Sequence, residues 1–584
     1  MHVAVIDFDK CHFKKCRQEC QYYCPPVRNG TMTVDFMESG YPEIHEELCI
    51  GCGICAHRCP FEAIKIIGIP ERAKGDEVHR YGANGFVLYG LPSLEVNGMI
   101  GLLGQNGTGK TTILNILTGK LIPNFATEVE SRETVVEKYR GTYLGEYLKS
   151  IYSGKLKISL KPQYVDLIPK HFSGKVSELL GQYGDNAKKV LEELGVDDIY
   201  KKDVKELSGG ELQAMSISAA LMKDADIYFF DEPSSYLDIS QRLKISRVLR
   251  ELSSSKKVLV VEHDLAILDF MSDFVYLTYG EPRGYGIVSN AYSTRQAINS
   301  YLEGYIKQEN MKFRDYEITF VKKPPEIDYS LTSLVQWTEL KKTFPGFSLK
   351  VNEGALRTGQ VVGVIGPNST GKSTFVRIMA SELQPDSGEV IGSVRTSYKP
   401  QSPDSGFQVS VLEFLESNLG DRASENQFRN DILKPLNIEG IGDTAVSDLS
   451  GGDLQKTYIA KTLGKDADLY ILDEPSAYLD ADQRMVVARM LKRFAENNKK
   501  TILVVDHDIY FIDIISTSLI VFNGSAGKWG ESMGPVDMRN GMNIFLKNLT
   551  ISFRRDQNTQ RPRINKPGSR MDNEQKKNGE YYYY

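Results

Sequence analysis

The sequence predicts an α/β protein in which two phosphate-binding nucleotide domains follow a small cysteine-rich α+β domain. Two observations carry this prediction. All eight cysteines lie between Cys11 and Cys59, and one series of nucleotide-binding motifs occurs twice in the rest of the chain. The 584 residues leave room for about three to five domains. A content of 41% hydrophobic and 25% charged residues is typical of a globular protein.

Charge and hydropathy exclude some classes of function. A net charge of −5 provides no overall basic field for nucleic acid, so any RNA contact must come from a local patch. The sequence contains no apolar run of the roughly 18 residues that a membrane span needs. Its N-terminus, which has two acids among the first nine residues, differs from a secretory signal. We therefore expect a cytoplasmic protein.

The cysteines form two groups of four, and each group ends in proline. The second group has the spacing C-x2-C-x2-C-x3-C-P, which is typical of cubane iron–sulfur ligands whose fourth thiolate binds a neighbouring cluster. The first group is spaced more loosely. If the ligands interleave as in two-cluster ferredoxins, the two [4Fe-4S] clusters are held by Cys11, Cys16, Cys20 and Cys59, and by Cys49, Cys52, Cys55 and Cys24.

Zinc and disulfides are the alternatives for these thiols. Structural zinc sites use paired CxxC knuckles, and neither group of four divides into two such knuckles. A disulfide framework needs an oxidising compartment, for which the chain carries no signal. Electron transfer and a purely structural role of the clusters both remain open.

Each copy of the repeat begins with the phosphate-loop motif G-x4-G-K-[ST], placed between an apolar strand and an apolar-periodic helix. In such loops backbone N–H groups and the helix N-terminus bind phosphate, the lysine reaches the β- and γ-phosphates, and the hydroxyl ligates Mg²⁺. The two loops are Gly104-Gln105-Asn106-Gly107-Thr108-Gly109-Lys110-Thr111-Thr112 and Gly366-Pro367-Asn368-Ser369-Thr370-Gly371-Lys372-Ser373-Thr374.

Further along each copy, an apolar strand ends in two acids, Asp231-Glu232 and Asp473-Glu474. The aspartate can hold the Mg²⁺ shell, and the glutamate can polarise the attacking water. A strand that ends in two acids is weak evidence by itself, because many strands run into a solvated loop.

A Leu-Ser-Gly-Gly element begins 24 residues before each aspartate and resembles the signature of ABC-type ATPases. Other motifs of that family are Lys-Pro-Gln, Tyr-Leu-Asp and a histidine after an acid. The matching residues are Ser208, Gly209, Gly210, Gln163, Asp238 and His263 in copy one, and Ser450, Gly451, Gly452, Gln401, Asp480 and His507 in copy two.

This resemblance implies an ABC fold, a RecA-like core with a helical subdomain, in each copy. It also implies that two ATP molecules lie head to tail between the copies, with Lys110 facing Ser450 and Lys372 facing Ser208. Glu232, Glu474, His263 and His507 are then the catalytic residues. The implied Mg²⁺ ligands are Thr111, Gln163, Ser373 and Gln401.

Copy one is longer than copy two by a segment around residues 131–156, in which Val135–Ile151 predicts a helix pair with a glycine break. The segment is either a solvated insertion or a contact with a large partner. Residues 551–584 hold eight Lys or Arg and four Asp or Glu, so this tail is either solvated or in contact with phosphate. The terminal tyrosine run has no evident role.

The whole chain resembles the RNase L inhibitor family, the ribosome-recycling ABC proteins of archaea and eukaryotes. Distinctive matches are Glu232-Pro-Ser-Ser-Tyr-Leu-Asp238, His79-Arg80-Tyr81, Arg140-Gly-Thr, Phe553-Arg-Arg-Asp and Arg561-Pro-Arg-Ile-Asn-Lys. Two departures are small: Asp453 stands where the family usually has glutamate, and neither signature has the usual arginine after Leu-Gln.

The resemblance implies that ATP-driven closure swings the iron–sulfur domain and splits the ribosome, together with a class 1 release factor or Pelota. The resemblance also implies a monomer whose two ABC domains pair within the chain. This monomer is expected to stay on the small subunit until ATP is hydrolysed. There it would contact rRNA, ribosomal proteins and initiation factors. Tyr81 and Phe86 are expected to stack on adenine in copy one, and Phe344 or Phe347 in copy two.

Two other functions compete with this one. An ATP-gated redox protein would need an acceptor, and the sequence offers no flavin fingerprint or third cysteine set. A soluble ATPase subunit of a transporter has no reason to carry eight N-terminal thiolates. The expected organisation is a ferredoxin-like domain (1–72), a first ABC domain (73–290), a hinge (291–316), a second ABC domain (317–535), and a second hinge with a basic tail (536–584).

Overall fold

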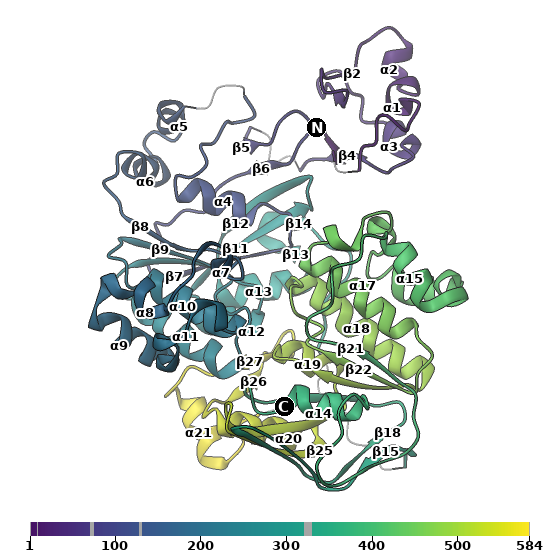
Figure 1. Cartoon of the computed structure of the whole chain (residues 1–584). Coiled ribbons are helices and arrows are strands. Elements are labelled where there is room, and N and C mark those ends of the chain that lie inside the picture. Colours follow the sequence, from purple (N-terminus) through teal and green to yellow (C-terminus); the bar gives the residue numbers. More distant parts are fainter. Residues whose placement is uncertain (1, 9, 71–74, 128–130, 321–329, 583–584) are drawn as a thin grey trace.

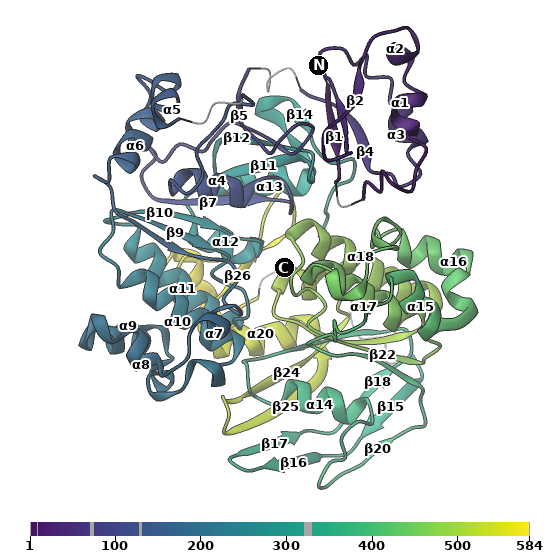
Figure 2. The ribbon, with the colours of Figure 1, turned by 45° about the horizontal axis from the view of Figure 1, so that its top comes forward.

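The computed structural model describes the whole chain except residues 1, 9, 71–74, 128–130, 321–329 and 583–584. Two large α/β lobes face each other. A small N-terminal domain stands at one end of the first lobe, and the C-terminal segment lies at the junction of the lobes (Figures 1 and 2). Within the described part of the chain, no helix is both long enough and apolar enough to cross a membrane.

The N-terminal domain combines two antiparallel strand pairs with three short helices, which confirms the predicted α+β class. Its core buries Ala4, Ile6 and Val34 beside Cys20, Cys24 and Cys55. The pairs are β1 (His2–Ile6) with β4 (Ile64–Gly68) and β2 (Val34–Phe36) with β3 (Pro42–Ile44). The helices are α1 (Glu19–Tyr22), α2 (Pro25–Arg28) and α3 (Ile54–Arg58).

The first lobe is built on an eight-stranded sheet with a parallel centre. The central strands are buried on both faces, so they are apolar runs without alternation. The spatial order is β5 (Glu77–Arg80), β6 (Val87–Tyr89), β12 (Tyr285–Ser293), β11 (Phe274–Glu281), β7 (Met99–Gly104), β10 (Lys257–Val261), β9 (Ile227–Asp231) and β8 (Ile158–Lys161).

Helices cover this sheet and form a subdomain beside it (Figure 1). The phosphate-loop helix α4 (Lys110–Leu117) follows β7 directly. The other helices are α7 (Ile168–His171), α8 (Val176–Leu179), α9 (Asp185–Leu194), α10 (Gly209–Leu221), α11 (Ile239–Leu252), α12 (Leu265–Met271) and α13 (Thr294–Glu303).

The second lobe repeats this plan, and its eight strands follow the same order. They are β16 (Leu340–Phe344), β17 (Phe347–Val351), β25 (Trp529–Asp537), β24 (Ser518–Ser525), β19 (Val361–Ile365), β23 (Thr501–Val505), β22 (Leu469–Asp473) and β21 (Thr396–Lys399). A small side sheet joins β18 (Gly354–Arg357), β15 (Ser333–Trp337) and β20 (Val390–Ile391). The shared strand order confirms the duplication and the α/β fold class predicted from the motifs.

The helices of the second lobe begin, as in the first lobe, with one that follows the phosphate loop directly. They are α14 (Lys372–Met379), α15 (Val411–Leu419), α16 (Asn426–Phe428), α17 (Gly451–Gly464), α18 (Ala481–Asn498), α19 (Ile509–Ile515) and α20 (Met538–Asn548).

The segment that lengthens the first copy contains two helices, α5 (Arg132–Lys138) and α6 (Tyr143–Tyr152), which project from the first lobe (Figure 1). The Ser131 and Thr142 side chains cap their N-termini by accepting backbone N–H bonds. Val135, Tyr147 and Leu148 are buried against the lobe, so one face of the pair is anchored.

The C-terminal segment forms a joint between the lobes. It contains β26 (Phe553–Arg555), β27 (Pro562–Ile564) and α21 (Arg570–Asn578). The linker between the lobes contains a separate short strand pair, β13 (Tyr305–Ile306) and β14 (Met311–Lys312). Arg561 is fully buried in the joint. It donates to Asp269 and Asn299 of the first lobe and to the Tyr510 hydroxyl of the second.

The solvated interpretation of the basic tail is therefore wrong for Arg555, Arg561 and Arg563, whereas phosphate contact of the tail stays a prediction. Arg555 forms a bidentate ion pair with buried Asp513, and Arg563 forms one with buried Asp269. Tyr582 of the terminal tyrosine run has a structural role, because it is buried and its hydroxyl donates a hydrogen bond to Asp513, while Tyr583 and Tyr584 lie outside the described residues. These charges and rings hold the joint together instead of facing solvent.

Candidate functional site

Each phosphate loop lies between a central strand and the helix that follows it. Gly109 and Gly371 precede the helices with φ of 92° and 95°, and a Cβ at Gly109 would approach the Phe86 ring to 2.9 Å. Only glycine fits that turn. Thr111 and Ser373 fall in the first helical turn, where a hydroxyl can face a bound cation.

The two loop lysines are buried and turned back on their own loops. The Lys110 ammonium donates to the carbonyls of Gly104 at 2.9 Å and Gln105 at 2.7 Å, and Lys372 donates to Gly366 and Pro367 at 2.8 and 2.6 Å. Burial lowers the pKa of Lys372 to about 8, although nearby carboxylates favour its charged form. An anion at the helix N-terminus would restore the charge balance of this ammonium.

The predicted catalytic residues gather at the end of β9 in the first lobe. The Gln163 amide donates to Glu232 Oε1 at 2.7 Å, and His263 Nε2 lies 3.5 Å from the same oxygen. Burial lowers the pKa of His263 well below its usual value, and the Lys110 charge acts in the same direction. The imidazole is therefore neutral at pH 7.

The second lobe repeats the arrangement at the end of β22. The Gln401 amide donates to Glu474 Oε1 at 2.8 Å, and His507 Nε2 lies 3.6 Å away. Burial works against ionisation of Glu474. The nearby His507, the hydrogen bond from Gln401 and the charge of Lys372 outweigh burial and lower the pKa to about 2. Glu474 is thus a carboxylate over the whole physiological range.

The aspartates that precede these glutamates are buried carboxylates whose charge a bound cation would stabilise. Burial and the adjacent Glu232 raise the pKa of Asp231 to about 7, and burial and Glu474 raise that of Asp473 to about 6. Both carboxylate oxygens of Asp473 are buried, and neither has a hydrogen-bond partner among the described residues. Hard oxygen ligands next to a hydroxyl and an amide oxygen suit Mg²⁺.

The lobes meet through two equivalent hydrogen bonds. Asp238 Oδ2 accepts the backbone N–H of Asn368, and Asp480 Oδ2 accepts that of Asn106, both at 2.8 Å. The other oxygen of each aspartate caps its own helix, α11 or α18. Each phosphate loop is therefore held by the opposite lobe, as a head-to-tail pair requires.

The signature serines begin long helices in both lobes. Ser208 and Ser450 cap α10 and α17, and their hydroxyls donate to Glu211 at 2.8 Å and Asp453 at 2.7 Å. Asp453 thus accepts the serine hydroxyl as Glu211 does, but of these two described acids only Glu211 also accepts the backbone N–H of its serine. The pairing of Lys110 with Ser450 and of Lys372 with Ser208 stays a prediction.

The aromatic residues that are predicted to stack on adenine lie beside the phosphate loops. The Tyr81 and Thr112 hydroxyls share a hydrogen bond of 3.2 Å at helix α4, and Tyr81 is half exposed. The Phe86 ring lies against Gly109, and the Phe347 ring lies against Gly371 in the same way. Of the two candidates in the second copy, Phe347 is therefore the counterpart of Phe86.

The motifs did not reveal Asp482, two residues beyond Asp480. Its carboxylate accepts from the Gln105 amide of the opposite phosphate loop at 3.3 Å and from Arg314 of the linker at 2.6 Å. The only sequence signal is an acid in copy two where copy one has Ser240.

The interleaved ligand sets stay a prediction, and the thiols that raise one another's pKa fall into two groups. Burial raises the pKa of Cys11 to about 11 and of Cys20 to about 12, with additional increases from Cys16 and Cys59. Burial likewise raises that of Cys55 to about 11, and the neighbours that add to it are Cys49, Cys52 and Cys24.

One pocket is lined by four cysteines together with Val34, Ile44 and Ile50, and these cysteines are Cys24, Cys49, Cys52 and Cys55. In the described ranges, no group of three or more His, Cys, Asp or Glu side chains is arranged to hold a single metal ion. Thiols spread around a space fit the corners of a cluster, because each binds a different iron.

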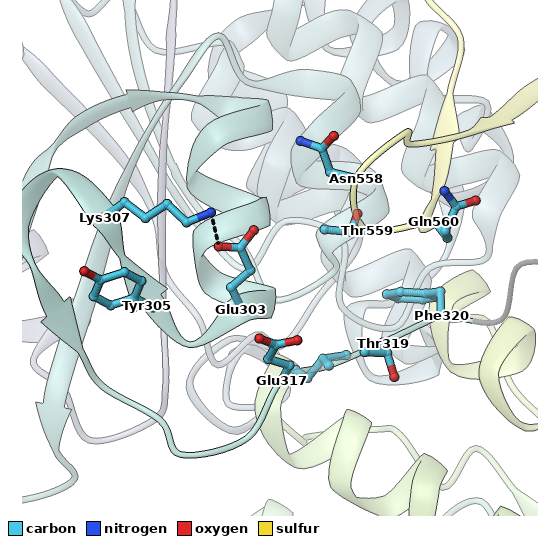
Figure 3. A pocket seen from close by; sticks show the side chains of 10 residues that line it. Glu303, Tyr305, Lys307, Glu317, Thr319, Phe320, Asn558, Thr559 and Gln560 are labelled. Atoms are coloured by element: carbon cyan, nitrogen blue, oxygen red, sulfur yellow. Dashed lines mark ion pairs between the residues drawn. The ribbon is translucent and has the colours of Figure 1, made fainter.

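A further cavity of about 500 Å³ lies at the joint (Figure 3). It is bordered by Glu303, Lys307, Glu317 and the turn Asn558–Gln560, and Lys307 pairs with Glu303 at its edge. None of its lining residues belongs to a phosphate loop, a signature or a catalytic motif.

Comparison with known proteins matches these features. The ABC transporter family model matches residues 93–235 and 349–477. A Fer4-like domain described as possible in RNase L inhibitor matches residues 1–31, and a 4Fe-4S binding domain matches residues 42–65. Both nucleotide lobes and both cysteine groups thus lie within recognised sequence families.

Similarity to known relatives covers the full length of this chain. Translation initiation factor RLI1 of Chaetomium thermophilum is 41% identical and covers 100% of this chain and 97% of its own. A model of ribosome-bound archaeal Pelota and ABCE1 is 47% identical with a TM-score of 0.95, covering 100% of this chain and 99% of that one. A complex of archaeal stalk protein aP1 with ribosome recycling factor aABCE1 is 46% identical with a TM-score of 0.82, covering 87% and 99%. This chain belongs to the RNase L inhibitor (ABCE1) family.

Proposed function

We propose that this protein is an ATP-dependent ribosome recycling factor in which closure of the two lobes on ATP splits the ribosome into subunits. The observation that carries the proposal is the reciprocal grip of each phosphate loop by an aspartate of the other lobe, Asp238 on Asn368 and Asp480 on Asn106. A chain so arranged converts nucleotide binding into relative motion of its lobes.

ATP would enter each site with its phosphates at the loop and the helix N-terminus. Lys110 and Lys372 would leave the carbonyls they now contact and bind the β- and γ-phosphates. Thr111, Gln163 and Asp231 in one site, and Ser373, Gln401 and Asp473 in the other, would hold Mg²⁺, which neutralises phosphate charge. Tyr81 with Phe86, and Phe347, would flank the base.

Hydrolysis needs a water oriented toward the γ-phosphate. Glu232 and Glu474 would polarise that water, and neutral His263 with His507 would contact the γ-phosphate. Ser450-Gly451-Gly452 and Ser208-Gly209-Gly210 of the opposite lobe would complete the grip. Loss of the γ-phosphate would then loosen the interface.

The N-terminal domain would be the lever. Its eight cysteines would hold two [4Fe-4S] clusters that stiffen it. Ion pairs tie it to the first lobe: Lys65 with Glu281 at 2.5 Å and Glu46 with Arg80 at 2.7 Å. A rigid domain anchored beside a nucleotide site moves as a body when that site closes.

The partners that we propose are the small ribosomal subunit with its rRNA and proteins, and Pelota or a class 1 release factor. The names of two relatives support this, since one is a model with ribosome-bound Pelota and one a complex with a ribosomal stalk protein. An additional link to initiation factors rests on the name of the RLI1 relative. Helices α5 and α6 offer a surface for such a contact.

The test is sedimentation with ribosomal subunits. The protein should co-sediment with small subunits in the presence of a non-hydrolysable ATP analogue, and subunits should separate when ATP and Pelota are added. Equal binding with and without nucleotide, or no binding, would contradict the proposal.

A further inference from the structure

The two nucleotide sites differ by one hydroxyl group next to the glutamate that would polarise water. In the first lobe Ser235 Oγ donates to Glu232 Oε2 at 3.1 Å, while Gln163 occupies Oε1. Both carboxylate oxygens are therefore held. At the same position the second lobe has Ala477, whose methyl group can donate nothing to Glu474.

The surrounding backbone is the same in both lobes. Glu232 and Glu474 have left-handed φ values of 47° and 48°. The N–H of Ser235 bonds to the Glu232 carbonyl at 3.4 Å, and that of Ala477 bonds to the Glu474 carbonyl at 3.3 Å. The difference is thus confined to one side chain and does not come from a different turn.

A second hydrogen bond matters because the last torsion of a glutamate is soft. With one oxygen held, the carboxylate plane can rotate about that contact. With both held, its orientation is fixed, and general-base catalysis depends on such positioning. The Glu232 side chain is 19% exposed, so solvent competes little for the bond.

Ser235 also lies in the loop that touches the other lobe. The next residue, Tyr236, packs its ring 6.0 Å from that of Tyr478 at an interplanar angle of 79°. Asp238, three residues on, holds Asn368. The hydroxyl thereby links the Glu232 carboxylate to a loop whose position depends on contact between the lobes.

We infer that Ser235 is a positioning residue that orients Glu232 in the site of Lys110, and that the site of Lys372 lacks this device. The inference rests on the proposed ATPase function. Glu232 is coupled through Ser235 to the loop that contacts the other lobe, whereas Glu474 has the contacts with Gln401 and His507 but no such hydroxyl.

The experiment measures ATP hydrolysis by full-length protein with one site silenced. In a Glu474→Gln background, Ser235→Ala should lower kcat about 5-fold with KM unchanged, as expected for loss of one hydrogen bond to a charged group. Ser235→Thr should restore at least half of the rate, because it returns the hydroxyl. The same Ser235→Ala change in a Glu232→Gln background should alter turnover less than about 2-fold.

The reciprocal substitution is the matched control. Ala477→Ser in the Glu232→Gln background should raise kcat of the second site several-fold, with the melting temperature unchanged. If a Gln background abolishes all turnover, the comparison is made in the wild type, where Ser235→Ala and Ala477→Ser should change kcat in opposite directions.

The outcomes separate the two proposals. Absence of ATPase activity in the wild type would overturn the proposed function. Activity in the wild type with no effect of Ser235→Ala, an effect on KM alone, or no rescue by Ser235→Thr would overturn the inference and leave the function standing.

Discussion

At the scale of single residues, the sites are defined by charges held away from water. Lys372 is buried and Asp473 carries two buried oxygens without partners in the described structure, so each group is costly unless a ligand of opposite charge arrives. Phosphate and Mg²⁺ supply those charges together. The residues that would bind nucleotide therefore reduce stability until they bind it, and nucleotide should stabilise the fold.

Replacement of Glu232 or Glu474 by Gln should separate binding from hydrolysis. The amide keeps the shape of the carboxylate but cannot polarise water, so we expect a loss of turnover at that site of about 100-fold or more while ATP stays bound. ATPase assays and small-subunit co-sedimentation check this. The exposed Glu251→Gln on α11 is the control, and unchanged turnover in both site variants would refute the role.

At the scale of elements, the joint depends on buried ion pairs. Arg561 has no exposed side-chain surface, and Asp269 is 2% exposed. Arg561→Ala removes one of the hydrogen-bond donors of the Asp269 carboxylate, which stays buried away from water. We expect a loss of about 3–5 kcal/mol in the free energy of unfolding, measured by urea denaturation. Lys577→Ala, an exposed change on α21, should cost less than about 0.5 kcal/mol.

The same joint should weaken in acid. Burial raises the pKa of Asp556, but N–H bonds from Asn558 and Thr559 and the charges of Arg561 and Arg295 outweigh burial and lower it to about 2. The ionised Asp556 carboxylate therefore stabilises the fold at pH values above 3.8, the ordinary pKa of an aspartate. This stabilisation is lost as the pH falls toward 2 and the carboxylate is protonated. Thermal melting between pH 5 and pH 2 should therefore show a smaller acid-dependent loss in Asp556→Asn than in the wild type.

Substitution of single cysteines should show which of them bind the same iron–sulfur cluster. Cys24→Ser and Cys55→Ser should each remove the same cluster, whereas Cys59→Ser should remove the other, although Cys59 is nearer to Cys55 in sequence. Iron should fall from about eight to about four per chain in each variant, and Cys24→Ser with Cys55→Ser should fall no further. A double variant with almost no iron would contradict the interleaving.

At the scale of the whole molecule, the lobes and linker meet at Asp482. The carboxylate joins Arg314 of the linker to Gln105 of the phosphate loop in the opposite lobe, and Tyr316 also donates to it. The Arg314 side chain is 4% exposed, and it also donates to the carbonyls of Tyr301, Leu302 and Tyr316. This contact has no equivalent through Pro367, because proline has no side-chain donor.

Asp482→Ala should therefore make closure of the lobes harder. We expect about a 10-fold increase in the ATP concentration needed for half-maximal closure, since an ion pair and an inter-lobe bond are lost together. Energy transfer between dyes on the two lobes measures it. Ser240→Ala, at the same position in the first lobe, should leave this ATP concentration unchanged. An equal increase in both variants would contradict the role of Asp482.

The two phosphate loops, the acid pairs, the signatures and the thiol groups are all predictable from the sequence. A phosphate or cluster is bound by residues that follow one another in the chain, so spacing alone records the chemistry. The tertiary structure added the inter-lobe bonds of Asp238 and Asp480, the burial of Arg561 and Tyr582, the contacts of Ser235 and Asp482, and the choice of Phe347 over Phe344. These contacts join residues up to several hundred positions apart, and their partners depend on how two folded surfaces meet, which no local spacing encodes.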